Sequence, residues 1–151
     1  MTTIAWDGKT LAADSMGDQN GLRTKVRKLH RGVLADGKGF MFGGAGETAW
    51  CVMLYEWLKT LESKQLTRVP YPHQEERHDP ACLLVVKRVG VFRKVGAVLI
   101  PVESNTYAIG SGRDFAISAM HFGHSAKDAV KHAMMFDVYS GGSIQTMELV
   151  G

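Results

Sequence analysis

The chain has 151 residues, close to one ordinary domain, and a chain of this length buries roughly 68–70% of its surface. Hydrophobic residues make up 45% and charged residues 22%, values that exclude disordered, collagen-like and coiled-coil chains. The formal net charge of +3 is too small to argue for a nucleic-acid partner. No apolar run reaches the roughly 18 residues that a membrane-spanning helix needs, and the first residues lack the features of a secretion signal. We therefore expect one domain over residues 1–151, located in the cytoplasm, with no membrane or nucleic-acid partner.

The two cysteines, Cys51 and Cys82, each lie within an apolar run. Such positions favour reduced, buried thiols over a disulfide framework. Free thiols are the usual state of cysteine in the cytoplasm, so the cysteines and the first residues of the chain lead to the same expected compartment.

The N-terminal third of the chain predicts β structure. Residues 3–6 and 9–13 flank Asp7-Gly8, a strong signal for a two-residue hairpin. Asp36-Gly37 is a similar signal between two apolar runs, 29–35 and 39–42.

A helix is predicted from Glu47 onward, because the apolar side chains there recur at helical spacing. This stripe consists of Trp50, Met53, Leu54, Trp57, Leu58 and Leu61. Residues 64–80 are polar and rich in proline, which is typical of a connection. The remaining expected elements are short strands over 81–86, 91–95, 97–100 and 106–109, helices over 113–121 and 126–136, and a strand over 143–150. In the second of these helices, Ser125 and Asp128 form the expected N-terminal capping box. Strands gathered in blocks and separated by helices indicate an α+β fold, with sheets covered by helices.

Residues 32–39 read Gly-Val-Leu-Ala-Asp-Gly-Lys-Gly, one residue short of a phosphate-binding loop. Gly39 stands where the magnesium-binding Ser or Thr of such a loop belongs. The segment also connects two predicted strands, whereas a phosphate-binding loop leads from a strand into a helix. These two differences argue against nucleotide hydrolysis.

Three further patterns are incomplete. Residues 44–49 match a dinucleotide-binding fingerprint, but no strand with a ribose-binding acid follows promptly. His121 and His124 have a metal-like spacing without the other ligands of a metal site. Ser111 lacks the flanking pattern of a serine nucleophile. We expect no cofactor and no metal.

Thr2 carries the sharper chemical signal. Removal of Met1, usual before a small residue, leaves a threonine whose hydroxyl and free α-amine belong to one residue. The α-amine has a reference pKa of about 7.7–8.0, close enough to neutrality to accept the hydroxyl proton. Nucleophile and base therefore arrive together.

Asp14 and Lys25 are the candidates for tuning Thr2. The predicted hairpin about Asp7-Gly8 returns Asp14 to the level of Thr2. A nearby cation lowers the pKa of the amine and of the hydroxyl, and a buried carboxylate holds that cation in place. Lys25 is the cation that we expect in this role.

Six segments in this order resemble the proteasome β-subunits and their bacterial HslV-type relatives, which are N-terminal nucleophile hydrolases. The segments are Thr2-Thr3-Ile4, Ala12-Ala13-Asp14-Ser15, Thr24-Lys25-Val26-Arg27-Lys28-Leu29, Ala45-Gly46-Glu47-Thr48-Ala49, Ala108-Ile109-Gly110-Ser111-Gly112 and Asp137-Val138-Tyr139-Ser140-Gly141-Gly142. The resemblance spans residues 2–149 and implies an αββα four-layer sandwich.

The resemblance also implies roles for individual residues. The catalytic set would be Thr2, Asp14, Lys25, Gly46, Ser111, Asp137 and Ser140. In that set Thr2 is the nucleophile, and the Gly46 N–H stabilises the oxyanion at a helix N-terminus. The substrate-binding positions would be Gly17, Arg23, Gly44 and Thr48, with Arg23 favouring acidic side chains. Structural roles remain as alternatives: an ion pair for Asp14 with Lys25, close packing for Gly46, and a turn for Ser140.

The function expected from this resemblance is a threonine peptidase without a cofactor, acting on peptides or unfolded proteins within a homo-oligomeric ring. A chamber of this kind implies an ATP-driven unfoldase or activator as a partner. Two alternatives stay open: a non-catalytic ring or scaffold protein, and a small-amide hydrolase of the same superfamily.

Overall fold

The computed structural model describes residues 2–73 and 79–149. Met1, part of the expected connection over residues 64–80 and the last residue of the strand expected over 143–150 lie outside these ranges. The described residues have mixed α/β structure, and all of their strand pairs are antiparallel. Mixed α/β content is what the order of predicted elements requires.

The first sheet brings the two ends of the sequence together. Its strands are β1 (Thr3–Trp6), β2 (Thr10–Ala13), β10 (Tyr107–Gly110) and β11 (Gln145–Glu148), in the order β10-β1-β2-β11. The hairpin between β1 and β2 turns at Asp7-Gly8, as predicted. Because β1 lies between β2 and β10, the residue that precedes β1 has neighbours from both.

The second sheet has five strands in sequence order. They are β5 (Leu29–Val33), β6 (Gly39–Ala45), β7 (Ala81–Val86), β8 (Gly90–Val95) and β9 (Val98–Pro101). The predicted hairpin about Asp36-Gly37 is confirmed by the pairing of β5 with β6.

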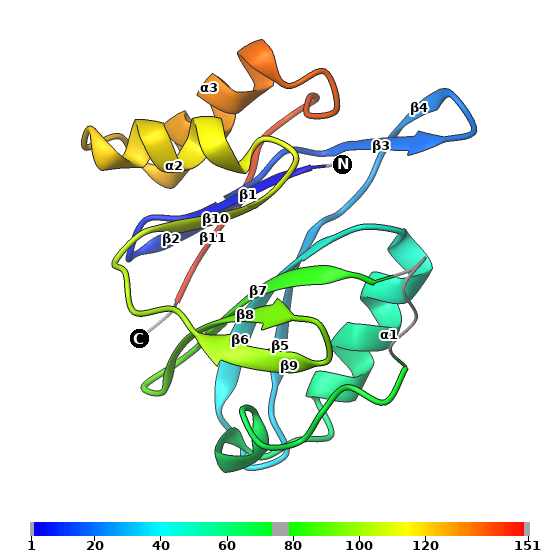
Figure 1. Cartoon of the computed structure of the whole chain (residues 1–151), viewed down its shortest axis with the longest axis vertical. Helices are drawn as coiled ribbons and strands as arrows, with labels where there is room; N and C mark the ends of the chain where they lie inside the picture. Colours follow the sequence, from blue (N-terminus) through cyan, green and yellow to red (C-terminus); the bar gives the residue numbers. More distant parts are fainter. Residues whose placement is uncertain (1, 74–78, 150–151) are drawn as a thin grey trace.

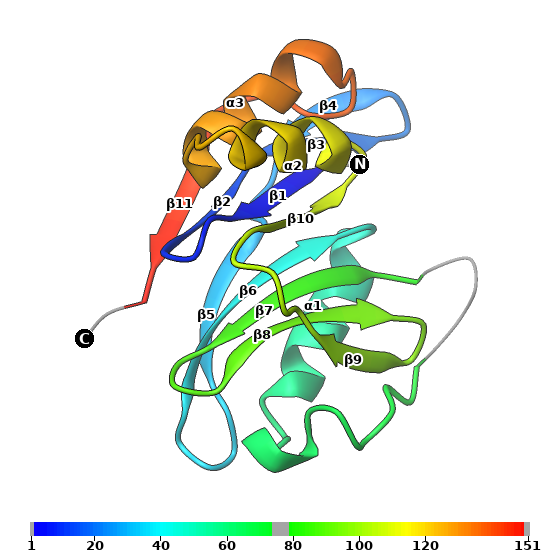
Figure 2. The same cartoon turned by 60° about the vertical axis from the view of Figure 1, so that its left-hand side comes forward.

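A separate hairpin was not among the predicted elements. It consists of β3 (Met16–Gln19) and β4 (Leu22–Lys25), and it extends away from the two sheets (Figures 1 and 2). Asn20 and Gly21 have φ values of 53° and 84°, as a type I′ turn requires at both central residues. Asn-Gly is itself the signal by which the sequence could have revealed this hairpin.

The α-helices are α1 (Thr48–Leu58), α2 (Arg113–His121) and α3 (Ala126–Phe136), and a short 3₁₀ helix η1 spans Ser63–Gln65. Helices α2 and α3 have the predicted bounds. The Ser125 hydroxyl caps α3 by accepting a hydrogen bond from the Asp128 N–H at 3.2 Å. No helix of the described residues is long and apolar enough to span a membrane.

The predicted stripe of α1 is buried only in part. Leu54 and Leu58 are fully buried, whereas Met53 is 38% exposed. Leu61 is buried beyond the end of the helix.

Three clusters of buried side chains hold these elements together. Successive residues of β1 alternate between two of them: Ile4 and Trp6 face the second sheet, and Ala5 faces α2 and α3. The third cluster packs Leu54 and Leu58 of α1 on the outer face of the second sheet. Figure 2 shows α2 and α3 above the first sheet and the second sheet below it.

Candidate active site

Thr2 lies at the start of β1, is 2% exposed, and is held from several directions. Its hydroxyl Oγ1 donates to Asp14 Oδ1 at 3.2 Å, and its N–H donates to Ser111 Oγ at 3.1 Å. Its carbonyl oxygen accepts from the Gly112 N–H at 3.2 Å. Both groups that the sequence identified as chemically important, the hydroxyl and the nitrogen, therefore have polar partners.

Two glycines allow the chain to approach Thr2 closely. Gly110 ends β10 with φ of +96°, and a Cβ added there would overlap the Thr2 carbonyl group. A Cβ added at Gly112 would overlap the hydroxyl of Thr3. Only glycine fits the space and the backbone conformation at Gly110.

Asp14 lies beside Thr2 because β2 pairs back on β1. The Asp14 N–H donates to the Thr3 carbonyl at 3.2 Å, so hairpin geometry brings the two residues to one level, as expected. The carboxylate is completely buried. Its Oδ1 accepts from Thr2 Oγ1 at 3.2 Å, the Thr3 N–H at 3.0 Å and Lys28 Nζ at 2.8 Å, and its Oδ2 accepts from the Gly141 N–H at 2.9 Å and the Met16 N–H at 3.3 Å.

Lys28, and not Lys25, is the cation at Asp14, and this corrects the sequence interpretation. Lys28 is 7% exposed, and its ammonium forms the ion pair with Asp14 at 2.8 Å. Lys25 is exposed at the end of β4, opposite Met16, because the β3–β4 hairpin leaves the sheets. Both lysines lie in one basic segment, but only Lys28 directly precedes Leu29, the buried first residue of β5. Burial lowers the pKa of Lys28. The hydrogen bond and the charge of Asp14 raise it, but they do not fully compensate for burial, so the pKa of Lys28 stays below its usual value.

Gln145 is a positioning residue that sequence reasoning missed. Its Oε1 accepts from the Lys28 N–H at 3.0 Å, and its Nε2 donates to the Val26 carbonyl at 2.8 Å. The side chain thus fixes the backbone on both sides of Arg27, in the segment that carries Lys28. No motif identified it, because a lone glutamine in a strand has no distinctive spacing.

Ser111, Asp137 and Ser140 form a hydrogen-bonded group on the nitrogen side of Thr2. Asp137 Oδ2 accepts from both Ser111 Oγ and Ser140 Oγ at 2.6 Å. The single hydroxyl proton of Ser140 is used in this way, so the 2.7 Å contact with Thr3 Oγ1 has Thr3 as the donor. Burial opposes ionisation of Asp137, but the hydrogen bonds from the two serines outweigh it and lower the pKa of this carboxyl.

Gly46 lies where β6 passes into α1. Its φ is +125°, a conformation that favours glycine, and it is exposed immediately before Glu47, the N-cap residue. The N–H groups and the dipole at this end of the helix favour negative charge.

The four expected substrate-binding residues lie on two separate parts of the fold. Gly17 and Arg23 belong to the β3–β4 hairpin, whereas Gly44 belongs to β6 and Thr48 begins α1. A Cβ added at Gly44 would crowd Phe42 and Cys51 rather than enter open space.

An open cavity of about 430 Å³ lies between the hairpin and the loop that carries Gly142. Its lining residues are Ser15, Met16, Arg23, Thr24, Lys25, Gly142 and Ser143. Of the four expected substrate-binding residues it therefore includes Arg23 alone.

Among residues 2–73 and 79–149, no three His, Cys, Asp or Glu side chains come together in a way that could hold a metal ion.

The fold is that of proteasome-like proteins, and the resemblance predicted from the sequence is confirmed at this level. BPH from Thiobacillus denitrificans, a bacterial proteasome homologue solved in complex with epoxomicin, matches with a TM-score of 0.68 and 21% identity, covering 99% of each chain. Anbu, an ancestral β-subunit from Yersinia bercovieri, matches with a TM-score of 0.71 and 14% identity over 97% of this chain and 80% of its own. A mutant Anbu from Hyphomicrobium sp. strain MC1 matches with a TM-score of 0.70 and 13% identity over 99% and 82%. Neither a protein-family model nor a curated protein matches the sequence.

Proposed function

We propose that this protein is a proteasome-like threonine peptidase that cleaves peptide bonds through Thr2 once Met1 has been removed. The observation that carries the proposal is the convergence of a charged pair and a hydrogen-bonded serine group on Thr2. Asp14 accepts from the Thr2 hydroxyl at 3.2 Å, and Ser111 accepts from the Thr2 nitrogen at 3.1 Å.

In the proposed reaction, Thr2 Oγ attacks the carbonyl carbon of the scissile peptide bond while the α-amine accepts the hydroxyl proton. The tetrahedral intermediate then collapses, the C–N bond breaks, and the α-ammonium returns the proton to the leaving amine. Water, deprotonated by the same amine, hydrolyses the acyl ester and restores the threonine. No cofactor enters this sequence of steps.

The ion pair of Asp14 with Lys28 supplies the electrostatic part of the proposal. A buried ammonium near Thr2 favours the negative charge that develops on Oγ during attack. Asp14 keeps this cation in place and also binds the Thr3 N–H, so the nucleophile and its cation share one anchor. Lys28 replaces Lys25 in the catalytic set.

The group of Ser111, Asp137 and Ser140 serves the base. After Met1 removal the Thr2 nitrogen becomes an amine that donates to Ser111 Oγ, as its N–H does at 3.1 Å. Ser111 in turn donates to Asp137, whose ionised state is favoured by its two hydroxyl donors. A carboxylate one hydroxyl away stabilises the α-ammonium that forms in the first step.

The Gly46 N–H would bind the oxyanion of the tetrahedral intermediate. Its exposure and its position before α1 support this assignment, because the donors and the dipole at a helix N-terminus both favour an anion.

The substrates would be peptides or unfolded proteins. Gly17, Arg23, Gly44 and Thr48 are the proposed determinants of side-chain preference, with Arg23 selecting acidic residues. Its position on the wall of the 430 Å³ cavity supports a contact with bound peptide. The measurement that checks this preference compares fluorogenic peptides with an acidic and an apolar residue before the cleaved bond. Equal cleavage of both would contradict it.

The sandwich would be the αββα type, and the chain would assemble into a homo-oligomeric ring fed by an ATP-driven unfoldase. The three core clusters support the αββα sandwich, since they join α2 and α3 to the first sheet, the two sheets to each other, and α1 to the second sheet.

Exposed apolar side chains support assembly into a ring, because a large exposed apolar patch usually marks an interface. Those on and after α2 and α3 include Phe115, Ile117, Phe122, Met135, Phe136 and Val138.

The experiment that tests the proposal is an intact-mass measurement after incubation with epoxomicin, a peptide epoxyketone, which needs both the hydroxyl and the free amine of an N-terminal threonine. BPH of Thiobacillus denitrificans has been solved with this compound. We expect a single adduct on the chain that lacks Met1 and none on the Thr2→Ala chain. A correctly processed chain that forms no adduct and cleaves no peptide would contradict the proposal.

Two measurements distinguish the two alternatives from the proposed peptidase. Biological function that survives Thr2→Ala would indicate a ring or scaffold protein without catalysis. Cleavage of small amides but not of peptides by the unmodified chain would indicate a small-amide hydrolase.

A further inference from the structure

A second, larger cavity lies at the other end of β6 from Gly46. Its volume is about 650 Å³, which is within the range of small-molecule sites. Gly39 opens β6 and lines this cavity, whereas Gly46 follows the last residue of the strand. Seven strand residues span about 20 Å, so the cavity is separate from the candidate active site.

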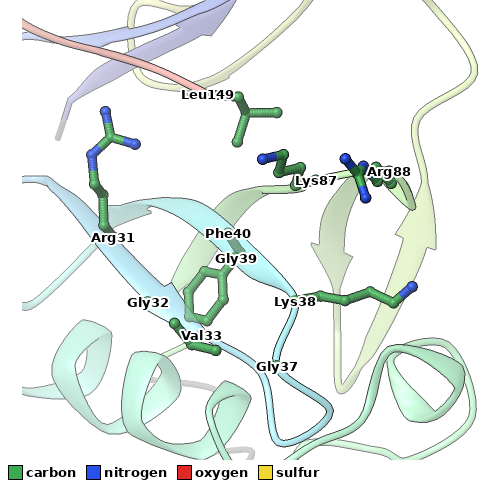
Figure 3. A pocket seen from close by; sticks show the side chains of 10 residues that line it. All are labelled: Arg31, Gly32, Val33, Gly37, Lys38, Gly39, Phe40, Lys87, Arg88 and Leu149. Atoms are coloured by element: carbon green, nitrogen blue, oxygen red, sulfur yellow. The ribbon is translucent and has the colours of Figure 1, made fainter. Parts of the chain in front are cut away.

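Four basic side chains from three segments line this cavity, which we call the basic pocket (Figure 3). Arg31 comes from β5, Lys38 from the turn between β5 and β6, and Lys87 with Arg88 from the turn between β7 and β8. The lining residues include no Asp or Glu. The side chains that line this cavity therefore carry positive charge and no negative charge.

Asp36 and Glu148, next to the pocket in sequence, each accept from a hydroxyl outside it, and Asp36 also interacts with Lys38, whose N–H donates to Asp36 Oδ1 at 3.4 Å. Asp36 Oδ2 accepts from the Ser63 N–H at 3.0 Å and from the Ser63 hydroxyl at 2.6 Å. Glu148 Oε1 accepts from the Thr10 hydroxyl at 3.0 Å. Arg31 Nη2 donates at 2.7 Å to the backbone carbonyl of Glu148, which does not neutralise its charge.

The backbone around the pocket holds these side chains in place. Arg88 has φ of +64°, a left-handed conformation that costs a non-glycine residue about 1–2 kcal/mol. The Lys87 N–H donates to the Gly39 carbonyl at 2.9 Å, which ties the two turns together. The Arg31 carbonyl accepts from the Tyr55 hydroxyl. The backbone segments that carry the four cations are therefore tied to their neighbours.

The open floor and the apolar wall of the pocket complete its chemistry. A Cβ at Gly37 or Gly39 would meet no atom within 4 Å, so the turn leaves space above its backbone. Val33 is 56% exposed, and Leu149 is half-buried at the top of the view in Figure 3. The site thus combines several cations with an apolar wall.

We propose that the basic pocket binds an oligophosphate, as a free polyphosphate or as the phosphate chain of a nucleotide. Linked phosphates carry three or four negative charges along one short chain, and Arg and Lys are the usual partners of phosphate oxygens. Isolated carboxylates of a peptide spread their charge more widely. The pocket is no phosphate-binding loop: it lies between two strands, and the Leu34 and Gly37 N–H groups are used within the turn itself. The side chains, and not a backbone cradle, carry the binding.

The test is isothermal titration of the full chain with tripolyphosphate, with ATP and with adenosine, at low and moderate salt. Two variants remove charge from the pocket, Lys38→Gln and Arg88→Gly, and the second also relieves the left-handed backbone. Lys127→Gln on the exposed face of α3 is the matched control, because it removes the same charge from a helix that packs on the first sheet, whereas the pocket lies on turns of the second sheet (Figure 2). Thermal unfolding of each variant establishes that it is folded.

We expect tripolyphosphate to bind the wild-type chain and each pocket variant to weaken binding about tenfold, with the control within twofold. ATP binding tighter than tripolyphosphate would identify a nucleotide as the ligand, and tripolyphosphate binding tighter than ATP would identify free polyphosphate. The proposal is overturned if tripolyphosphate does not bind at millimolar concentration in low salt. It is also overturned if Lys127→Gln weakens binding as much as the pocket variants, or if poly-glutamate binds equally well with the same dependence on Lys38 and Arg88. Peptide cleavage does not enter this test, so its outcome is independent of the proposed peptidase.

Discussion

The Lys28 ammonium donates to Asp14 Oδ1 at 2.8 Å, and both side chains are almost completely enclosed by protein. The same oxygen accepts from the Thr2 hydroxyl, so the cation lies one atom away from the proposed nucleophile. A buried pair of this kind is costly to break, because removal of one partner leaves the other charge buried without compensation.

Lys28→Met should therefore abolish peptide cleavage and destabilise the fold by about 3–5 kcal/mol. Lys25→Met, three positions earlier on the exposed end of β4, should leave the free energy of unfolding and kcat unchanged, with any effect confined to KM because Lys25 lines the 430 Å³ cavity. Peptide hydrolysis and urea unfolding of both variants check this. The double variant Asp14→Asn with Lys28→Met should regain part of the stability but no activity. Equal loss of activity in Lys25→Met would contradict the assignment.

Ser111→Ala should reduce kcat/KM roughly ten- to a hundredfold. This corresponds to a hydrogen bond to a charged group worth about 1.5–3 kcal/mol. Ser111 is exposed, so the loss of stability should be small. The pH profile of kcat/KM should shift as well, because the amine loses its link to Asp137. Ser118→Ala, on the exposed face of α2, is the control, and an unchanged pH profile in Ser111→Ala would argue for a purely structural serine.

Gly110→Ala should prevent stable folding or cost more than about 3 kcal/mol, because its Cβ would overlap the Thr2 carbonyl at a positive φ. Gly21 has a similar φ of +84° but nothing within 4 Å of an added Cβ. Gly21→Ala should therefore cost only the conformational term of about 1–2 kcal/mol. Urea unfolding of the two variants separates the overlap from the conformational cost. Equal costs would show that the approach at Gly110 is not tight.

Asp137→Asn should alter stability at low pH in a defined direction. The pKa of Asp137 in the folded protein is lowered from 3.8, so its ionised form is favoured by folding. The stability that it contributes is present above the ordinary pKa of 3.8 and is lost as the pH falls through the lower, folded value. The difference in unfolding midpoint between wild type and variant should therefore be largest above about pH 5 and shrink toward pH 2. A difference that stays constant with pH would exclude this linkage.

Cys51 and Cys82 should be unreactive toward a thiol reagent at pH 8 in the folded protein. Burial raises the pKa of Cys51 to about 11 and that of Cys82 to about 12. Almost no thiolate is present at pH 8, and Cys82 is completely enclosed. A colorimetric thiol titration should find two thiols after denaturation and none beforehand. Rapid labelling of either thiol in the folded protein would contradict their assignment as inert, structural cysteines.

Local signals in the sequence were sufficient to predict features that depend on a single turn or helix end. The Asp7-Gly8 turn predicted the β1–β2 hairpin, and with it the position of Asp14 beside Thr2. The capping residue Ser125 similarly defined the start of α3. Such features depend on a few neighbouring residues and on backbone geometry alone.

The choice between Lys25 and Lys28 could not be made in this way. It depends on where the chain leaves the β3–β4 hairpin and enters the second sheet, and a short segment with two lysines does not reveal that point. Gln145 was missed for a related reason, since its contacts with Lys28 and Val26 cross 117 and 119 positions of sequence. Local sequence patterns could not predict which polar side chains, distant in sequence, come into contact in the fold.

The hydrogen bonds around Thr2 and Asp14 have a consequence for protein synthesis. Thr2 and Asp14 are made first, but their partners Ser111 and Gly141 follow 109 and 127 positions later. A chain still being translated therefore carries Thr2, the proposed nucleophile, without the groups that orient its nitrogen and bind the buried Asp14 carboxylate. The proposed site would be complete only after the segment with Gly141 has been made and has docked against Asp14.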